Sequence, residues 1–292
     1  MNGSALEMAR HVQIVTNPTA GSYDARKIAA LVSAFASEGA SATISYVSAG
    51  QQLVIEDGAD VLCAAGGDGT LRHLVHSAII SGQAIPIAPY PMGTINLYHR
   101  ETGYPKDAAA FAKAVLAQSG KAAHFPVSIN DTLFLGCASM GPDAHAVASV
   151  SSALKRRIGR LAYAAALLGH LLRWPRPQLT LIADGKRHPC EAVYIAKGRF
   201  FAGPWSFAPL AARAHQKLHV VALKNASRWH FFRFVRNTMR GRPLDARDNL
   251  IVLTCTALRI EGDRDWPVQA DGDDAARLPV DIAVRAETFA IL

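Results

Sequence analysis

The segment Gly66-Gly67-Asp68-Gly69-Thr70 combines residue types suited to binding phosphate. It follows the apolar run ADVLCAA and precedes LRHLVHSAI, so it is expected to connect a buried strand to a helix. Glycines let the backbone approach a ligand, the first amides of a helix attract phosphate, and Asp68 can reach a metal held by that phosphate. The alternative is a tight turn in which Asp68 caps the helix. No Gly-Lys-Ser/Thr follows, which excludes a Walker A loop.

Two further glycine-bearing loops follow other strand-like runs. Asn17-Pro18-Thr19-Ala20-Gly21 ends the run HVQIVTN, and Pro91-Met92-Gly93-Thr94-Ile95-Asn96 ends the run AIPIAPY. Because the carboxyl ends of parallel strands meet at one edge of a sheet, the three loops are expected to converge. Three such loops at one edge favour a nucleotide site over unrelated turns.

The elements that must position these loops alternate between strand and helix. The β-rich runs cover residues 11–17, 42–49, 59–67 and 84–90, and a helical segment covers 25–37. Strands and helices that alternate at this spacing predict an α/β fold with a parallel, helix-covered sheet.

After about residue 121 the strands follow one another closely, with an Asp184-Gly185 hairpin turn and helical segments at 142–173 and 227–240. We therefore expect two domains: a nucleotide-binding α/β domain at 1–124 and a β-rich, sandwich-like domain with helical insertions at 125–292.

The composition is that of a globular protein with a basic surface. Half of the 292 residues are hydrophobic and the formal net charge is +8, which excludes general disorder and favours anionic partners. The apolar stretch at 161–172 is shorter than the roughly 20 residues needed to span a bilayer, and no signal-peptide core is present. The four cysteines form no CxxC pair, so we expect a cytoplasmic protein with reduced thiols.

Two segments combine basic and apolar residues. Residues 154–174 are basic at the start and apolar afterwards, and residues 227–242 interleave arginines with Trp229, Phe231, Phe232 and Phe234. We expect peripheral attachment to an anionic membrane surface, at the inner face of the membrane. The alternative is two ordinary amphipathic helices with solvated arginines. No nucleic-acid module is recognisable, so no nucleic-acid partner is expected, and the oligomeric state stays open.

The chain resembles the diacylglycerol kinase catalytic-domain family, which includes bacterial lipid kinases, sphingosine kinases and ceramide kinases. The resemblance covers nearly the whole chain. GGDGT by itself is shared with NAD kinases and phosphofructokinases, whereas the later segments separate the lipid kinases from these relatives. The segments that carry it are NPTAG, GGDGT, PMGTIN, MGPDA at 140–144, LKRRIGRLAY at 154–163, FAP at 207–209 and VQADGD at 268–273.

The resemblance implies an ATP- and Mg²⁺-dependent lipid kinase with a Rossmann-like N-terminal domain. Its acceptor would be a lipid hydroxyl, on diacylglycerol or on a sphingoid lipid such as ceramide, and the β-rich second domain would receive that lipid. Asp68 would take part in catalysis and hold the metal, and Asp273 would be the general base where the family has Glu. The residues implied to bind the nucleotide are Asn17, Pro18, Thr19, Gly21, Gly66, Gly67, Gly69, Thr70, Gly93 and Thr94.

Several positions depart from the family pattern. Arg72 and His73 replace an Asn-Glu pair, and Leu97 replaces an Asp. Ala214-His215-Gln216 stands where an Asp-Gly of some members contributes to a structural metal site, so we expect that site to be absent. Two alternatives follow: an NAD kinase, although the chain has no Asn-Glu dipeptide for that acceptor, and a catalytically silent nucleotide- or lipid-binding protein.

Overall fold

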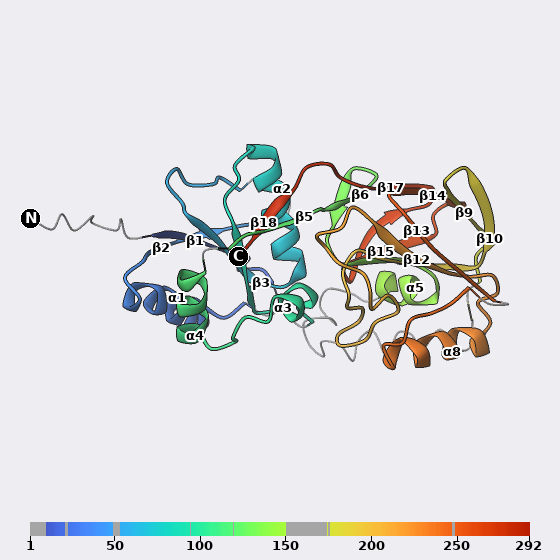
Figure 1. Ribbon diagram of the computed structural model, residues 1–292, viewed down its shortest axis with the longest axis horizontal. Helices are drawn as coiled ribbons and strands as arrows, with labels where there is room; N and C mark the ends of the chain where they lie inside the picture. The colour runs from blue at the N-terminus through green and yellow to red at the C-terminus, as the bar shows by residue number, and fades with distance from the viewer. Residues whose placement is uncertain are drawn as a thin grey trace, which may run out of the picture. The chain divides into compact units, whose positions relative to one another are not determined.

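The computed structural model describes residues 10–20, 23–48, 53–93, 95–118, 120–149, 174, 176–246 and 249–292 (Figure 1). The chain forms two compact units. The first contains residues 1–93, 102–123 and 289–292, and the second contains residues 94–101 and 124–288.

The first unit is built on a sheet with the strand order β2-β1-β3-β4-β18-β5. Strands β1 and β2, β1 and β3, β3 and β4, and β4 and β18 pair in parallel. The parallel sheet predicted from the sequence is confirmed, and its carboxyl edge carries the glycine loops. The strands are β1 (His11–Thr16), β2 (Ser41–Tyr46), β3 (Val61–Gly66), β4 (Ile87–Pro91), β5 (Ala122–His124) and β18 (Phe289–Ile291).

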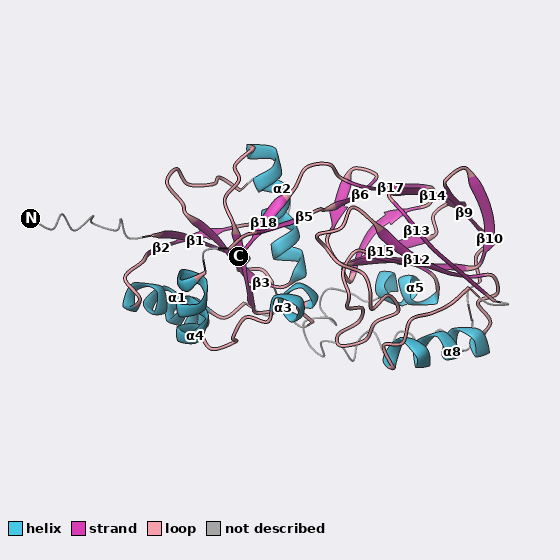
Figure 2. Cartoon of the chain, viewed as in Figure 1, coloured by secondary structure: helices cyan, strands magenta, loops and turns pink. Residues whose placement is uncertain are grey.

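Helices cover both faces of this sheet (Figure 2). Helices α1 (Ala25–Ser37) and α4 (Ala108–Ala117) contact each other and share a core with Cys63 and Ala65 of β3. Among the described residues, that core includes none from helix α2 (Asp68–Ser81), although α2 also contacts β3. Because side chains alternate along a strand, α2 covers the opposite face.

The second unit contains two antiparallel sheets. One has the order β10-β9-β14-β17-β6-β7 and the other the order β13-β12-β11-β8-β15-β16. The predicted Asp184-Gly185 turn joins β9 to β10, with φ values of +48° and +73°. The strands are β6 (Val127–Ile129), β7 (Thr132–Phe134), β8 (Cys137–Met140), β9 (Leu179–Ala183), β10 (Lys186–Cys190), β11 (Ala192–Ala196), β12 (Leu218–Leu223), β13 (Leu250–Cys255), β14 (Ala257–Gly262), β15 (Pro267–Ala270), β16 (Asp273–Arg277) and β17 (Val280–Val284).

The inner faces of the two sheets form one apolar core, in which Leu181 and Ile282 of the first sheet meet Ile195 and Val220 of the second. This arrangement is the β-rich, sandwich-like fold predicted from the sequence. The second unit also contains the helices α3 (Leu97–Thr102), α5 (Pro142–Ser149) and α8 (Arg228–Met239). The last residue of α3, Thr102, is assigned to the first unit. Tyr194 of β11 stacks on Phe234 of α8 at 4.3 Å between ring centroids.

Two short segments belong to a different unit from the one that the sequence predicts. Strand β18 pairs with β4 in the first unit, although the sequence places 289–292 in the second domain. Residues 94–101 belong to the second unit, although the sequence places them in the first domain. The division at 124/125 remains a prediction about which parts fold independently.

Some expectations fall on residues that the structure does not describe. These are Gly21, Thr94 and residues 150–173, which hold most of the first basic segment and of the helical segment predicted at 142–173. Within the described part of the chain, no helix is long and apolar enough to cross a bilayer. All four cysteines are buried and form no disulfide.

Candidate functional site

The glycine loop joins β3 to α2 as the sequence predicts. Gly67 is the residue before the helix, and Asp68 lies in the first helical turn, so the alternative in which Asp68 caps the helix is wrong. No side chain of the described residues caps this helix start, whereas Asp24 caps α1 and Asp107 caps α4. The start of α2 therefore offers backbone amides and the positive end of a helix dipole to an anion.

Gly66 is required by its contact with Thr70. A Cβ on Gly66 would lie 2.3 Å from Thr70 Oγ1 and 2.6 Å from Thr70 Cβ. Thr70 is buried and branched at Cβ, so it cannot swing aside without moving the first turn of α2. The glycine keeps the strand end and the helix start in close contact.

We expect Gly66→Ala to reduce the free energy of unfolding by about 1–3 kcal/mol, the usual cost of overpacking. Gly120→Ala is the matched control, because a Cβ there meets nothing within 4 Å. It should change the free energy by less than about 1 kcal/mol. Urea denaturation followed by circular dichroism measures both variants. Equal stability of Gly66→Ala and Gly120→Ala would contradict the packing argument.

The two other loops also lie at the carboxyl edge of the parallel sheet. Asn17 Oδ1 accepts hydrogen bonds from Thr19 N and Thr19 Oγ1, at 2.9 and 2.8 Å, which fixes the turn after β1. Met92 N, after β4, donates to Gly66 O at 2.9 Å. The structure thus brings together Asn17, Pro18 and Thr19, the loop Gly66–Thr70, and Gly93 along one edge.

A second candidate region is the turn Asp271-Gly272-Asp273 between β15 and β16. Asp271 Oδ1 accepts from the amides of Gly136 and Cys137 at 2.8 and 3.0 Å, and Oδ2 accepts from Leu135 N at 2.8 Å. Asp271 has φ = +50°, and its own amide donates to Cys137 O. Both oxygens of this carboxylate are engaged in holding the turn, so Asp271 is a structural residue.

A chain of buried polar groups connects this turn to the MGPDA segment. Gly272 N donates to Gln269 Oε1, and Gln269 Nε2 donates to Ser139 Oγ. Ser139 Oγ donates to Asp143 Oδ2 at 2.6 Å, and the Tyr194 hydroxyl donates to Asp143 Oδ1 at 3.1 Å. Burial raises the pKa of Asp143, and the two hydroxyl donors oppose that shift. These hydrogen bonds therefore connect the turn to buried residues of the second unit.

Leu135 and Gly136 also connect to a buried ion pair. Arg213 Nε donates to Glu101 Oε2 at 2.8 Å, and Arg213 Nη1 donates to Leu135 O at 2.6 Å. The guanidinium lies 3.8 Å from the centroid of the Tyr98 ring, and Glu101 Oε1 accepts from Arg199 N. The backbone of Leu135–Cys137 thus accepts a hydrogen bond from Arg213 and donates hydrogen bonds to Asp271. The ion pair and the Asp271 turn support each other.

Lys197 adds a buried ammonium to this cluster. Its Nζ donates to Arg213 O at 2.9 Å and to His215 O, which fixes the loop before β12. Burial and the charge of Arg213 lower the pKa of Lys197 to about 8, and the same two causes lower the pKa of His124 to about 4. No sequence signal pointed to this cluster, because Glu101, Lys197 and Arg213 are far apart along the chain.

We expect Glu101→Gln to reduce the free energy of unfolding by about 3 kcal/mol, because it leaves the Arg213 charge buried without its partner. The control is Glu261→Gln, whose partners Arg187 and Arg259 are 61 % and 42 % exposed and which should cost less than about 1 kcal/mol. Combining Glu101→Gln with Arg213→Met should recover part of the loss. Urea denaturation tests all three, and a cost for Glu101→Gln no larger than that of the control would contradict a stabilising ion pair.

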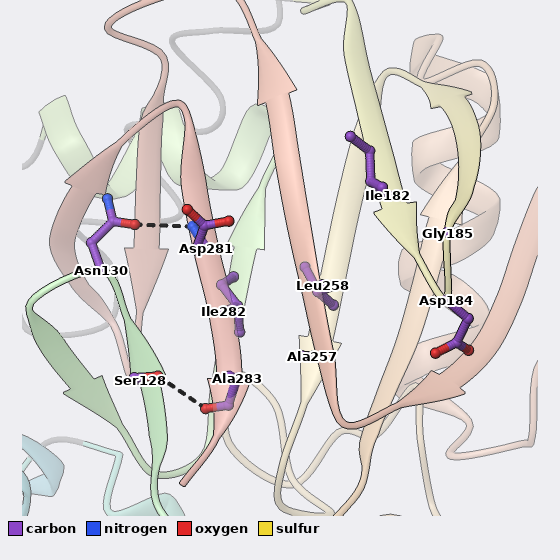
Figure 3. A pocket seen from close by; sticks show the side chains of 10 residues that line it. All are labelled: Ser128, Asn130, Ile182, Asp184, Gly185, Ala257, Leu258, Asp281, Ile282 and Ala283. Carbon is purple, nitrogen blue, oxygen red and sulfur yellow. Dashed lines mark hydrogen bonds between the residues drawn. The ribbon is translucent and has the colours of Figure 1, made fainter.

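A shallow pocket of about 370 Å³ lies on the sheet of the second unit that contains β6, β17, β14 and β9 (Figure 3). Asn130 Oδ1 accepts from Asp281 N there, and Ser128 Oγ donates to Ala283 O. None of the residues predicted to bind nucleotide or to act in catalysis lines this pocket.

Two family models together match almost the entire described chain. Residues 11–125 match the diacylglycerol kinase catalytic domain, and residues 136–292 match the YegS C-terminal NAD kinase beta sandwich-like domain. The chain belongs to the diacylglycerol kinase catalytic-domain family. It is accordingly an enzyme of the kinase type, a phosphotransferase.

Relatives of this chain have names that agree with this family. A Staphylococcus carnosus protein, provisionally named a lipid kinase, is 26 % identical over 240 residues, covering 80 % of this chain and 76 % of its own. The diacylglycerol kinase of Bacillus subtilis is 24 % identical over 224 residues, covering 75 % and 73 %. A solved Bacillus anthracis structure, provisionally described as a diacylglycerol kinase, has a TM-score of 0.74 at 18 % identity and covers 97 % of this chain and 96 % of its own. That likeness concerns the fold.

The positions at which this diacylglycerol kinase family member departs from the pattern have defined places. Arg72 and His73 lie on α2 in the turn after Asp68, and both are partly exposed. Leu97 begins α3 in the second unit and is buried. The structure thus places one changed pair in the first two turns of α2 and the other changed position, Leu97, in the core.

Proposed function

We propose that this protein is an ATP- and Mg²⁺-dependent kinase that phosphorylates a hydroxyl of a membrane lipid, either diacylglycerol or a sphingoid lipid such as ceramide. The observation that carries the proposal is the glycine loop of β3 and α2, with an uncapped helix start and Asp68 in its first turn. Family membership and the names of the relatives support a lipid acceptor.

On this proposal, ATP binds at the carboxyl edge of the parallel sheet. The loop residues Gly66, Gly67, Gly69 and Thr70 hold the phosphates, with the Asn17 turn and the loop at Gly93 and Thr94 beside them. Mg²⁺ is usually held by one or two carboxylates together with substrate phosphates and water. A single carboxylate at this helix start fits that role, so Asp68 would hold the metal. The metal would neutralise charge on the phosphates.

The lipid hydroxyl needs a base, and the second unit offers one. Both oxygens of Asp271 accept backbone amides, and Asp273 stands at the start of β16; both residues are partly exposed. Asp273 stands where the family carries Glu, and we propose it as the carboxylate that takes the hydroxyl proton as the bond to phosphorus forms. Positioning and charge neutralisation would supply the rest of the catalysis.

The test is a radiolabelled-ATP transfer assay of the purified full chain against diacylglycerol, ceramide, sphingosine and NAD. NAD is included because the second half matches a domain described as NAD kinase-like. We expect transfer to a lipid that requires Mg²⁺ and is lost on adding EDTA. Transfer to NAD alone would overturn the lipid proposal. Retained ATP binding without any transfer would identify a silent binding protein.

A further inference from the structure

Helix α8 lies at the edge of the second unit (Figure 1), and its side chains form one buried and one exposed face. Phe231 and Phe234 share a core with residues of β11 and β12, and Thr238 is also buried. On the opposite side, Trp229 is 68 % exposed, Phe232 61 % and Met239 53 %. Large apolar side chains with this exposure on one helix indicate an interaction surface.

Arginines lie on the same side of the helix. Arg233, Arg236 and Arg240 are exposed, and their spacing from Trp229 and Phe232 places them within one third of the helix circumference. We define the α8 outer face as Trp229, Phe232, Arg233, Arg236, Met239 and Arg240.

The charged residues of the segment that contains α8 are basic. Between Glu191 and Asp245 the sequence contains no Asp or Glu, and its ionisable side chains of basic type are Lys, Arg and His. An anionic partner therefore meets no repulsion from this segment.

We propose that the α8 outer face docks on an anionic lipid bilayer. Trp229, Phe232 and Met239 enter the headgroup region, and the three arginines contact lipid phosphates. The inference rests on the proposed function, because an enzyme acting on a bilayer lipid must reach the bilayer surface. Double-stranded nucleic acid would use the same arginines but would leave Phe232 and Met239 in water, so the apolar residues favour lipid.

The first experiment measures sedimentation of the full chain with vesicles, in the absence of ATP. Binding is expected to vesicles rich in phosphatidylglycerol, to be weak on pure phosphatidylcholine, and to fall in 1 M salt. Each basic side chain at such a surface contributes on the order of 5-fold in partitioning, so replacing Arg233, Arg236 and Arg240 by Gln should weaken binding roughly 100-fold.

The matched control replaces Arg26, Lys27 and Lys113 by Gln. These residues are exposed on α1 and α4 of the first unit, and their replacement changes the net charge equally. Near-unchanged binding of the control supports docking through α8. Equal loss in the two triple variants would overturn it, because net charge alone would then explain the attraction.

The second experiment uses Trp229 as a probe of depth. Its fluorescence should shift to the blue on adding anionic vesicles, and the shift should be absent in Trp229→Phe, while that variant still sediments. Retained sedimentation without a Trp229-dependent shift would overturn the proposal. Preferential binding to duplex oligonucleotide over vesicles would overturn it too. Because neither experiment contains ATP, failure of docking and failure of lipid phosphorylation are separate results.

Discussion

Asp68→Asn is expected to lower phosphoryl transfer by on the order of 10²–10³-fold while leaving the fold intact. The substitution keeps the size of the side chain but removes the charge proposed to hold Mg²⁺ at the phosphates. Asp68 does not cap α2, since Gly67 occupies the cap position, so the loss of a cap does not complicate the result. Transfer of radiolabelled phosphate from ATP to lipid measures the activity.

Asp107→Asn is the matched control for this prediction. Asp107 also lies at a helix start in the first unit, where its carboxylate accepts from Ala110 N, and Asn can replace it as a cap. Its activity should stay within roughly 2-fold of that of the unmodified enzyme, because surface substitutions usually have small effects. Full activity in Asp68→Asn would show that the proposed role of the glycine loop is wrong.

Asp273→Asn is expected to lower turnover by about 10²–10⁴-fold without loss of ATP binding, because the acceptor hydroxyl would lose its base. Asp273→Glu keeps a carboxylate and restores the residue that the family carries, so it should retain activity. Turnover is measured at saturating ATP, and nucleotide binding is measured separately by equilibrium titration.

Two neighbouring carboxylates serve as controls. Asp274 is exposed and paired with Arg277 at 2.7 Å, so Asp274→Asn should leave turnover nearly unchanged. Asp271→Asn should instead lower stability, because an amide offers one oxygen where the carboxylate uses two to hold three backbone amides. Near-normal turnover of Asp273→Asn would reject Asp273 as the base.

The sequence alone predicted the parts of the fold that depend on local pattern. The run 11–17 became β1, the segment 25–37 became α1, and the Gly66–Thr70 motif became the strand-to-helix loop. Each depends on periodicity or on turn residues within a few positions, which adjacent residues encode. The same local signals separated an α/β first half from a β-rich second half.

Only the tertiary structure decided the roles of residues that are distant in sequence. Asp271 and Asp273 are both acidic residues of one turn, and only the tertiary structure shows that the Asp271 carboxylate accepts the backbone amides of Leu135–Cys137. The pairing of Glu101 with Arg213 and the return of β18 to β4 likewise join segments more than one hundred residues apart. Such contacts form because a buried charge, a buried amide or a sheet edge must find a partner wherever the fold supplies one. No local pattern encodes which partner that will be.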